Sequence, residues 1–355
     1  MDRNSLRFIS CASYYGTGSS AVTDLLSEYE GIFNFSKQEF RFLQDPDGIS
    51  ELEYNLIENW NRHNSGHALK RYQKLVDFYC GNIFGRKFEK YFHGKWKEIS
   101  YRYIKELTDF TFHGYWMYDF YDRGHFFYFR KRLLNKILTK TIWRNQPDRY
   151  LNNMKNEVTY CSAPSEEKFL DCTKRYIEDL FRSVCTGYNT IMVDQIVPPN
   201  NSGRFLRYFN DLKIIVVDRD PRDLWSLEKY IWKDGVIPHE DVETFCKWFK
   251  YTRKHREFEN LHTEKIMFLQ FEDLIFHYFE TVSKIEKFAA LDSSAHKYIC
   301  DRFDPSKSVM NTQVWHRIGI VPREEIDYIE HELEKYLYKD FPDFSKVPKG
   351  KPGYV

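Results

Sequence analysis

The chain has 355 residues, of which 53 are Lys or Arg and 52 are Asp or Glu, so its net charge is +1. A chain of this length can bury a large core, either as one elaborated domain or as a core domain with a sub-domain. The balanced charge provides no overall field that would draw the protein to nucleic acid or to anionic lipid. We therefore predict no nucleic-acid partner.

The sequence also lacks the features of a secreted, membrane-spanning or zinc-binding protein. No segment approaches the ~20 apolar residues of a membrane span, and the N-terminal residues contain no signal-peptide core. The seven cysteines are odd in number, scattered and without a C-x-x-C pair, which indicates reduced thiols rather than disulfides or a zinc site. We expect a soluble, cytoplasmic protein without a membrane span or a bound metal.

Residues 6–29 contain a strand, a small-residue loop and a helix in succession. The short apolar run over 6–11 predicts a buried strand. Apolar residues at helical spacing then predict a helix that ends near Gly31. Between the two lies the loop 14–20, Tyr-Tyr-Gly-Thr-Gly-Ser-Ser.

This loop has the chemistry of an anion site. A strand, a glycine-bearing loop and a helix N-terminus aim free backbone N–H groups and the positive end of the helix dipole at a phosphate or sulfate. Gly16 and Gly18 let the backbone approach the anion, and Ser19 and Ser20 add hydroxyl donors. A tight turn that only serves packing would have the same pattern. The Gly-Lys-Ser/Thr of ordinary ATPases and kinases does not occur here.

Aromatic and polar residues alternate over residues 33–42, which predicts an edge strand or an extended loop, and residues 45–48 (Asp-Pro-Asp-Gly) predict a turn. Glu39 and Arg41 would point to the same side of such an extended segment. From spacing alone, a surface ion pair is the preferred interpretation of these two residues.

Residues 50–84 have a helical pattern, and residues 85–150 are rich in aromatic residues interleaved with basic ones. Such interleaving can bind single-stranded nucleic acid by stacking and phosphate contact. The more frequent meaning is an inserted helical sub-domain with its own aromatic core, which we favour here. Its expected role is a lid or wall over a substrate pocket.

Residues 212–217 form a continuous run rich in β-branched residues, typical of a central parallel strand. Asp220 is a good N-cap and Pro221 suits the first position of the helix that follows, which should end at Gly235. Arg219 lies at the carboxyl end of the strand, the edge where ligands bind in open parallel sheets. Its guanidinium could hold a phosphate through two hydrogen bonds.

The rest of the chain continues the alternation of helices and strands. The patterns predict a helix over 242–256, a strand over 265–271, a helix from Glu272, a loop over 308–319, an amphipathic helix over 324–338 and a frayed tail from 342. Asp194 and Gln195 follow a further strand, where either a role in a site or a simple strand-end turn fits the pattern.

Four of these segments, in this order, resemble the sulfotransferase family, which uses 3′-phosphoadenosine 5′-phosphosulfate (PAPS) on a P-loop-like α/β fold. Residues 17–20 are similar to the family's 5′-phosphosulfate loop, and residues 219–223 (Arg-Asp-Pro-Arg-Asp) to its 3′-phosphate motif. Residues 271–274 (Phe-Glu-Asp-Leu) resemble its Tyr-Glu-Asp-Leu segment, and residues 315–317 (Trp-His-Arg) its late loop over the nucleotide. The resemblance covers residues 6–41 and 190–337 and leaves out the aromatic insert.

The resemblance implies roles for particular residues. Tyrosylprotein sulfotransferases have a Glu-x-Arg shortly after the phosphosulfate loop, so Glu39 becomes a candidate catalytic base and Arg41 a candidate stabiliser of the transferred group. With this context the functional interpretation of Glu39 is preferred to the surface pair. The implied cofactor contacts are Gly16, Thr17, Gly18, Ser19, Ser20, Ala21, Arg219, Ser226, Trp315 and Arg317.

Two positions depart from the family. The Lys or Arg that often precedes the loop is replaced by Gly16, so another cation such as Arg41, Lys37 or His316 would have to assist the leaving phosphate. The serine of the 3′-phosphate motif usually lies eight residues after its arginine, where this chain has Leu227. Ser226 is one residue short, a rotation of about 100° on a helix, and an ordinary helix residue is an equally good interpretation of it.

Taken together, the sequence predicts an α/β protein with a central parallel sheet flanked by helices, in a P-loop NTPase-like sulfotransferase fold with an inserted, mainly helical, aromatic-rich sub-domain. Residues 1–341 would form one domain that includes the insert at about 85–150, and residues 342–355 a flexible tail. The expected activity is transfer of the sulfuryl group from PAPS to a hydroxyl of a saccharide or of a lipid- or sterol-like alcohol. The alternatives are an ATP-dependent small-molecule kinase and an inactive binding module. The sequence does not determine the oligomeric state.

Overall fold

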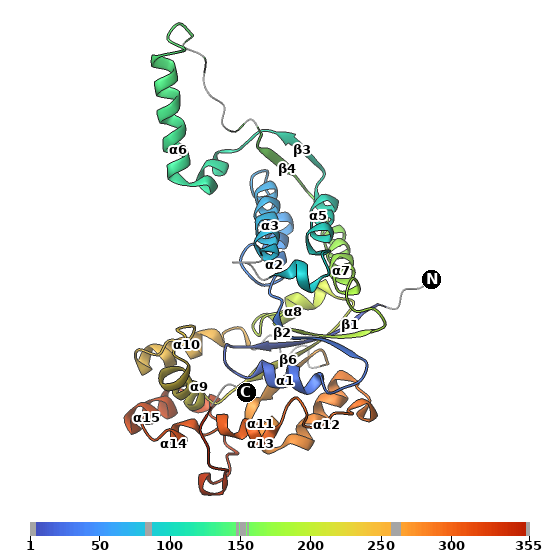
Figure 1. Ribbon diagram of the computed structural model, residues 1–355, viewed down its shortest axis with the longest axis vertical. Coiled ribbons are helices and arrows are strands. Elements are labelled where there is room, and N and C mark those ends of the chain that lie inside the picture. The colour runs from blue at the N-terminus through green and yellow to red at the C-terminus, as the bar shows by residue number, and fades with distance from the viewer. Residues whose placement is uncertain are drawn as a thin grey trace. The chain divides into compact units, whose positions relative to one another are not determined.

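The computed structural model describes residues 5–81, 87–146, 149, 154, 156–256 and 264–352, with the side chains of Ser36 and Lys37 outside this description. The chain divides into two compact units (Figure 1). The first combines Met1–Asp45 with Ile177–Val355, and the second is Pro46–Tyr176. The second unit contains the insert expected over 85–150 and extends beyond it at both ends. The structure is considered below one unit at a time.

The first unit is built on a five-stranded sheet in the order β2-β5-β1-β6-β7. All four strand pairings are parallel, as the buried apolar runs predicted. The strands are β1 (Arg7–Ser13), β2 (Ile32–Glu39), β5 (Thr190–Asp194), β6 (Asp211–Asp218) and β7 (Ile266–Gln270). The predicted α/β architecture with a central parallel sheet is therefore confirmed.

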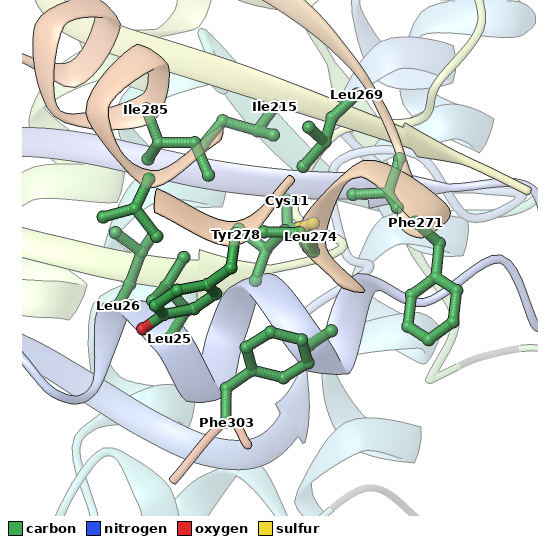
Figure 2. Packing of buried hydrophobic residues seen from close by; sticks show 14 of the residues in the cluster. Cys11, Leu25, Leu26, Ile215, Leu269, Phe271, Leu274, Tyr278, Ile285 and Phe303 are labelled. Carbon is green, nitrogen blue, oxygen red and sulfur yellow. The ribbon is translucent and has the colours of Figure 1, made fainter. Parts of the chain in front are cut away.

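One face of the sheet is covered by α1 (Ser19–Leu26), α11 (Phe271–Phe276) and α12 (Tyr278–Ala289). Side chains alternate along a strand, so Ile9 and Cys11 of β1 point into this layer, where they join Leu25, Leu274 and Ile285. Figure 2 shows side chains of the helices packed against those of the strands. This packing fixes the position of α1 behind the loop that precedes it.

Aromatic residues cover the opposite face. Phe8 of β1 points to this side and meets the rings of Phe181 and Phe209 at centroid distances of 5.3 and 5.0 Å. Phe181 belongs to α7 (Glu166–Arg182), and Phe209 follows the short helix α8 (Ser202–Phe205). Such edge-to-face pairs add to the free energy gained from burying the rings.

A third layer of helices follows β6. The helices α9 (Pro221–Leu227), α10 (Val242–Thr252) and α15 (Arg323–Glu332) share a core that includes Trp225 and Phe249. As predicted, Asp220 caps α9 by accepting a hydrogen bond from the Arg222 N–H, and Pro221 is the first helical residue.

Several segments of this unit differ from the sequence prediction. The helix expected over 324–338 is α-helical only over Arg323–Glu332, and a 3₁₀ turn over Glu334–Tyr336 follows it. The helix expected to reach Gly235 is α-helical only to Leu227, and a π-helical turn over Glu228–Trp232 completes it. The loop expected over 308–319 contains the helix α14 (Val314–Arg317) and follows α13 (Pro305–Ser308). The tail expected to be frayed contributes the buried Val347 to the core of this unit.

The second unit is mainly helical. Its helices are α2 (Ile49–Glu53), α3 (Asn64–Cys80), α4 (Phe88–Tyr91), α5 (Trp96–Leu107), α6 (Met117–Lys140) and the first part of α7. The antiparallel strands β3 (Phe110–His113) and β4 (Val158–Cys161) form a small sheet. In the aromatic core of this unit, the ring of Phe88 lies next to those of Tyr79 and Trp96, at centroid distances of 4.6 and 4.9 Å. In the part of the chain that the structure describes, no helix combines the length and apolarity needed to cross a bilayer.

Candidate functional site

A cavity of about 390 Å³ opens at the carboxyl end of the sheet in the first unit, and we call it the loop cavity. Seven of the residues for which the resemblance implies a role line it: Gly16, Gly18, Ser19, Ser20, Ala21, Glu39 and Arg219. They come from the loop after β1, the start of α1, the end of β2 and the end of β6. The carboxyl edge of a parallel sheet is where such folds bind ligands.

The loop needs glycine at both of its glycine positions. Gly16 and Gly18 have φ angles of +63° and +101°, a backbone conformation that L side chains rarely adopt. A Cβ atom on Gly18 would lie 2.5 Å from Cδ2 of Phe271, and one on Gly16 would lie 2.7 Å from Cζ3 of Trp232. The backbone of the loop is therefore held between the sheet and two aromatic rings.

Thr17 anchors the loop to the sheet. Its hydroxyl donates to the Val217 carbonyl at 2.7 Å and accepts from the Tyr14 N–H at 3.1 Å. The side chain is fully buried, so this hydroxyl shapes the loop and does not face the cavity. Of the predicted anion donors, Ser19 and Ser20 are the hydroxyls that line the cavity.

The N-terminus of α1 is open toward the loop. Gly18 is the N-cap and has no side chain to satisfy the first backbone N–H groups, and the first turn contains no acidic residue. The partial positive charge of the helix dipole is therefore not neutralised by a cap or by an acidic residue in the first turn of the helix. An anion in the cavity is the natural partner of these groups.

Arg219 brings a buried guanidinium to the same cavity. It follows the last residue of β6, is 4% exposed, and its guanidinium carbon lies 4.7 Å from the centre of the Phe271 ring. One terminal nitrogen donates to the Gly16 carbonyl at 3.3 Å and the other to the Asn311 carbonyl. The buried Nε has no hydrogen-bond partner among the described residues. A buried donor without a partner is costly.

Buried carboxyl groups behind Arg219 hold the surrounding segments together. Glu272 accepts from the Asp220 N–H at 2.9 Å, and Asp223 accepts from the N–H groups of Gln313 and Val314. Burial raises the pKa of Asp223 to about 7 and that of Glu272 well above its usual range. These contacts fasten the segment that contains Asn311 to the start of α9.

Glu39 and Asp194 form a pair of carboxyl groups on the cavity wall. They lie opposite each other in the register of β2 and β5, and both line the cavity. Burial raises the pKa of Asp194 to about 8, with a further contribution from the charge of Glu39. A hydrogen bond with the Ser19 side chain acts in the opposite direction. At neutral pH Asp194 therefore holds its proton beside Glu39.

We expect the Asp194→Asn variant to lose part of the pH dependence of stability. The folded protein keeps the Asp194 proton up to about pH 8, whereas the unfolded chain releases it near pH ~4. The free energy of unfolding therefore falls as the pH rises through this window, by up to ~1.4 kcal/mol per pH unit for this one group. The asparagine removes that contribution, so its urea-unfolding profile against pH should be shallower than that of the wild type. Parallel profiles for the two proteins would contradict the raised pKa.

Arg41 lies in a different cavity. Its guanidinium binds Asp45 at 2.9 Å and lies 5.8 Å from the centre of the Tyr15 ring. It lines a second cavity of about 340 Å³, the tyrosine cavity, with residues that include Tyr14, Tyr15, Gln195, Tyr251, Lys254 and His255. The structure records Asp45 as the ion-pair partner of Arg41, and the surface pair first considered for Glu39 and Arg41 is not among its salt bridges between described residues.

The three remaining predicted contacts do not line the loop cavity. Ser226 is buried and donates to the Arg222 carbonyl within its own helix at 2.7 Å. The Trp315 ring packs against the guanidinium of Arg222, whose central carbon lies 4.4 Å from the ring centre. Arg317 donates to the carbonyls of Thr312, Val309 and Pro348, so it braces the chain around Asn311 rather than facing the cavity.

The sequence analysis missed several residues of the cavity, above all Arg302. Among the described residues that line the cavity, Arg219 and Arg302 are the cationic ones. Buried Glu28 accepts from the N–H groups of Arg302 and Phe303 at 2.8 and 2.9 Å, and so fixes the segment that carries this exposed arginine. No local motif marks Arg302, because the contact joins residues far apart in the sequence. Neither Arg41 nor His316 lines this cavity, and the side chain of Lys37 lies outside the described residues.

No family model matches this chain, and no curated protein matches it either. The fold and the cavity by themselves define an α/β protein with an uncapped helix N-terminus and a buried arginine at the carboxyl end of a parallel sheet. Within the residues that the structure describes, no group of three or more His, Cys, Asp or Glu side chains is arranged to hold a metal ion.

Proposed function

We propose that the protein is a sulfotransferase that moves the sulfuryl group of PAPS to an acceptor hydroxyl. The observation that carries this proposal is the meeting of two anion-binding groups in the loop cavity. One is the uncapped start of α1, and the other is the guanidinium of Arg219 with its unpartnered Nε. A nucleotide with phosphate groups at both its 5′ and 3′ positions needs two such groups.

The residues of the cavity fit this co-substrate. The 5′-phosphosulfate would lie on the backbone of the glycine loop and the hydroxyls of Ser19 and Ser20, as anions do at helix N-termini. The 3′-phosphate would accept from Arg219. Arg302 is the further cation that lines the cavity, and it would take the place of the Lys or Arg that many sulfotransferases have at the position of Gly16. Its positive charge would stabilise the leaving phosphate.

The reaction requires one bond to form and one to break. The acceptor oxygen attacks sulfur in line, and the bond between sulfur and the bridging phosphate oxygen breaks to release adenosine 3′,5′-bisphosphate. The hydroxyl proton passes to the carboxylate of Glu39, the general base. Asp194, which lies beside Glu39, holds its own proton at neutral pH and so does not compete as the base.

The chemistry of the tyrosine cavity supports a saccharide as the acceptor. The lining of this cavity includes Tyr14 and Tyr15 of the glycine loop and Ser13, the last residue of β1. Its lining combines tyrosine rings with hydrogen-bonding and cationic side chains, which include Gln44, Asn200 and Lys254. Sugars are bound by such combinations of an apolar ring face and polar groups, whereas a sterol requires a dry, apolar pocket.

A second candidate is phosphoryl transfer from ATP, and one observation favours it. The Ser19 side chain lies close enough to Asp194, at the end of the strand next to β1, to lower the pKa of that carboxyl group. P-loop NTPases use a loop serine or threonine and a strand-end aspartate to hold Mg²⁺. The two proposals differ in the nucleotide that the cavity would bind.

Calorimetric titration of the wild-type protein distinguishes these functions. We expect adenosine 3′,5′-bisphosphate to bind in the micromolar range or more tightly, and ATP with Mg²⁺ to bind much more weakly, because only the first offers a 3′-phosphate to Arg219. A preference for ATP would replace sulfuryl transfer with phosphoryl transfer. Binding of neither nucleotide would leave the chain as a binding module that shares only the fold.

A further inference from the structure

The balanced charge of the whole chain conceals a strongly basic segment in the second unit. Residues 123–146 contain no Asp or Glu. The basic residues of this segment are Arg123, Arg130, Lys131, Arg132, Lys136, Lys140 and Arg144. Most of the segment belongs to α6 (Figure 1), whose α-helical conformation is interrupted at Gly124.

The apolar side chains of α6 are largely uncovered. Asp119, near the start of the helix, is its only buried residue, although the helix has 24 residues. Phe126 is 79% exposed and Phe129 is 64% exposed. Further exposed apolar residues follow along the helix: Leu133, Leu134 and Ile137. Scattered exposed apolar residues are common, but a continuous set on one helix marks an interaction surface.

The apolar and basic residues follow helical spacing. Phe126, Phe129, Leu133 and Ile137 recur every three or four residues, so they lie along one side of the helix. By the same geometry Arg130 and Lys136 lie on the two flanks of this stripe, and Lys131 lies nearly opposite it. Lysine and arginine at the flanks can extend their charged ends away from an apolar layer while their carbon chains stay in it.

We propose that α6 docks this protein on the surface of an anionic lipid bilayer. The apolar stripe would enter the boundary between headgroups and acyl chains, and the basic residues would contact the anionic headgroups. The helical part after Gly124 covers residues 125–140 and is about 24 Å long, which is shorter than the ~30 Å hydrocarbon core. The helix would therefore lie in the plane of the surface. This inference does not rest on the proposed activity.

Two other partners fit the same residues less well. A single-stranded nucleic acid would use the basic residues and the aromatic rings, but it offers no apolar layer to Leu133, Leu134 and Ile137. A second copy of the chain would bring two segments together that are both basic and both without acidic residues, so the helices would repel each other. An anionic bilayer accepts both the charge and the apolar stripe.

Flotation of the full-length protein with lipid vesicles tests this inference. We expect binding to vesicles of phosphatidylglycerol mixed with phosphatidylcholine, little binding to phosphatidylcholine alone, and weaker binding at high salt. Two double variants, Arg132→Glu/Lys136→Glu and Leu133→Ser/Ile137→Ser, should each lose at least about tenfold in affinity for the anionic vesicles. All four residues are exposed, so these changes leave the core intact, which circular dichroism would check.

The variant Lys349→Glu/Lys351→Glu is the matched control, because it makes the same change of net charge at exposed residues of the other unit. It should bind vesicles like the wild type. Equal binding to neutral and anionic vesicles, or unchanged binding in both α6 variants, would overturn the proposal. Failure to bind anionic vesicles would also overturn it. In that case, binding of a single-stranded RNA oligonucleotide would identify nucleic acid as the partner of α6, and a dimer in light scattering would identify a second copy of the chain.

Discussion

The Arg219→Ala variant should bind adenosine 3′,5′-bisphosphate about 10²–10⁴-fold more weakly than the wild type. The guanidinium is buried in the loop cavity, and a charge-assisted hydrogen bond in such a place contributes about 1.5–3 kcal/mol. A phosphate that accepts two of these bonds would lose both in the variant. Calorimetry on the two proteins measures the difference directly.

The same substitution also removes a positive charge from beside Asp223 and Glu272, so loss of binding must be separated from loss of folding. Arg219→Lys keeps the charge without the planar fork, and it should recover part of the affinity. Arg222→Ala is the control within the same motif, because Arg222 binds Asp220 and Glu330 rather than the cavity. It should lower thermal stability with little change in affinity. Undiminished affinity in a folded Arg219→Ala protein would rule out the proposed phosphate contact.

The second large effect should come from Glu39→Gln, which replaces the proposed base with a group of the same shape that cannot accept the proton. We expect sulfuryl transfer to fall by about 10²–10⁴-fold, the usual contribution of general base catalysis. Affinity for adenosine 3′,5′-bisphosphate should not fall, because the substitution removes no anion-binding group from the loop cavity and the proposed base acts on the acceptor hydroxyl. Transfer of labelled sulfate from PAPS to a panel of oligosaccharides and sterols, each supplied separately, measures the loss.

Asp24→Asn provides the comparison for this variant. Asp24 is another carboxyl group of the loop cavity, but it belongs to α1 and not to the carboxyl pair of β2 and β5. If turnover depends on the general negative charge of the cavity, turnover should fall to a similar degree in both variants. A large loss confined to Glu39→Gln identifies proton transfer as the cause, and full activity of that variant would dismiss Glu39 as the base.

The elements that the sequence predicted correctly are those with strong local signals. The apolar run before Asp218 became β6, and the Asp-Pro pair at 220–221 became the cap and first residue of α9. The turn between β1 and α1 was predicted in the same way, because Gly16 and Gly18 can adopt the positive φ angles that such a turn requires. Each of these signals lies within a few residues of the structure that it specifies.

The features that escaped prediction depend on contacts between distant residues. Asp223 binds the N–H groups of Gln313 and Val314, so a segment that has the composition of a loop forms a short helix. Glu28 fixes the position of Arg302, and no spacing in the sequence indicates it. Asp194 was recognised as a strand-end residue, but its raised pKa depends on burial that only the folded sheet creates.

The first unit is discontinuous in the chain, and this affects how the protein folds during synthesis. The central strand β1 pairs with β5 and β6, and its residue Arg7 lies opposite Thr190 and Asp211. The hydrogen bonds of β1 can therefore form only after these later strands have been synthesised. At ~5–20 residues per second, a ribosome needs about 10–40 s to make the intervening chain. The second unit is continuous and has its own aromatic core, so it can fold first while β1 and β2 remain unpaired. Apolar strands exposed for that long tend to aggregate, so we expect the nascent chain to depend on chaperones for its yield.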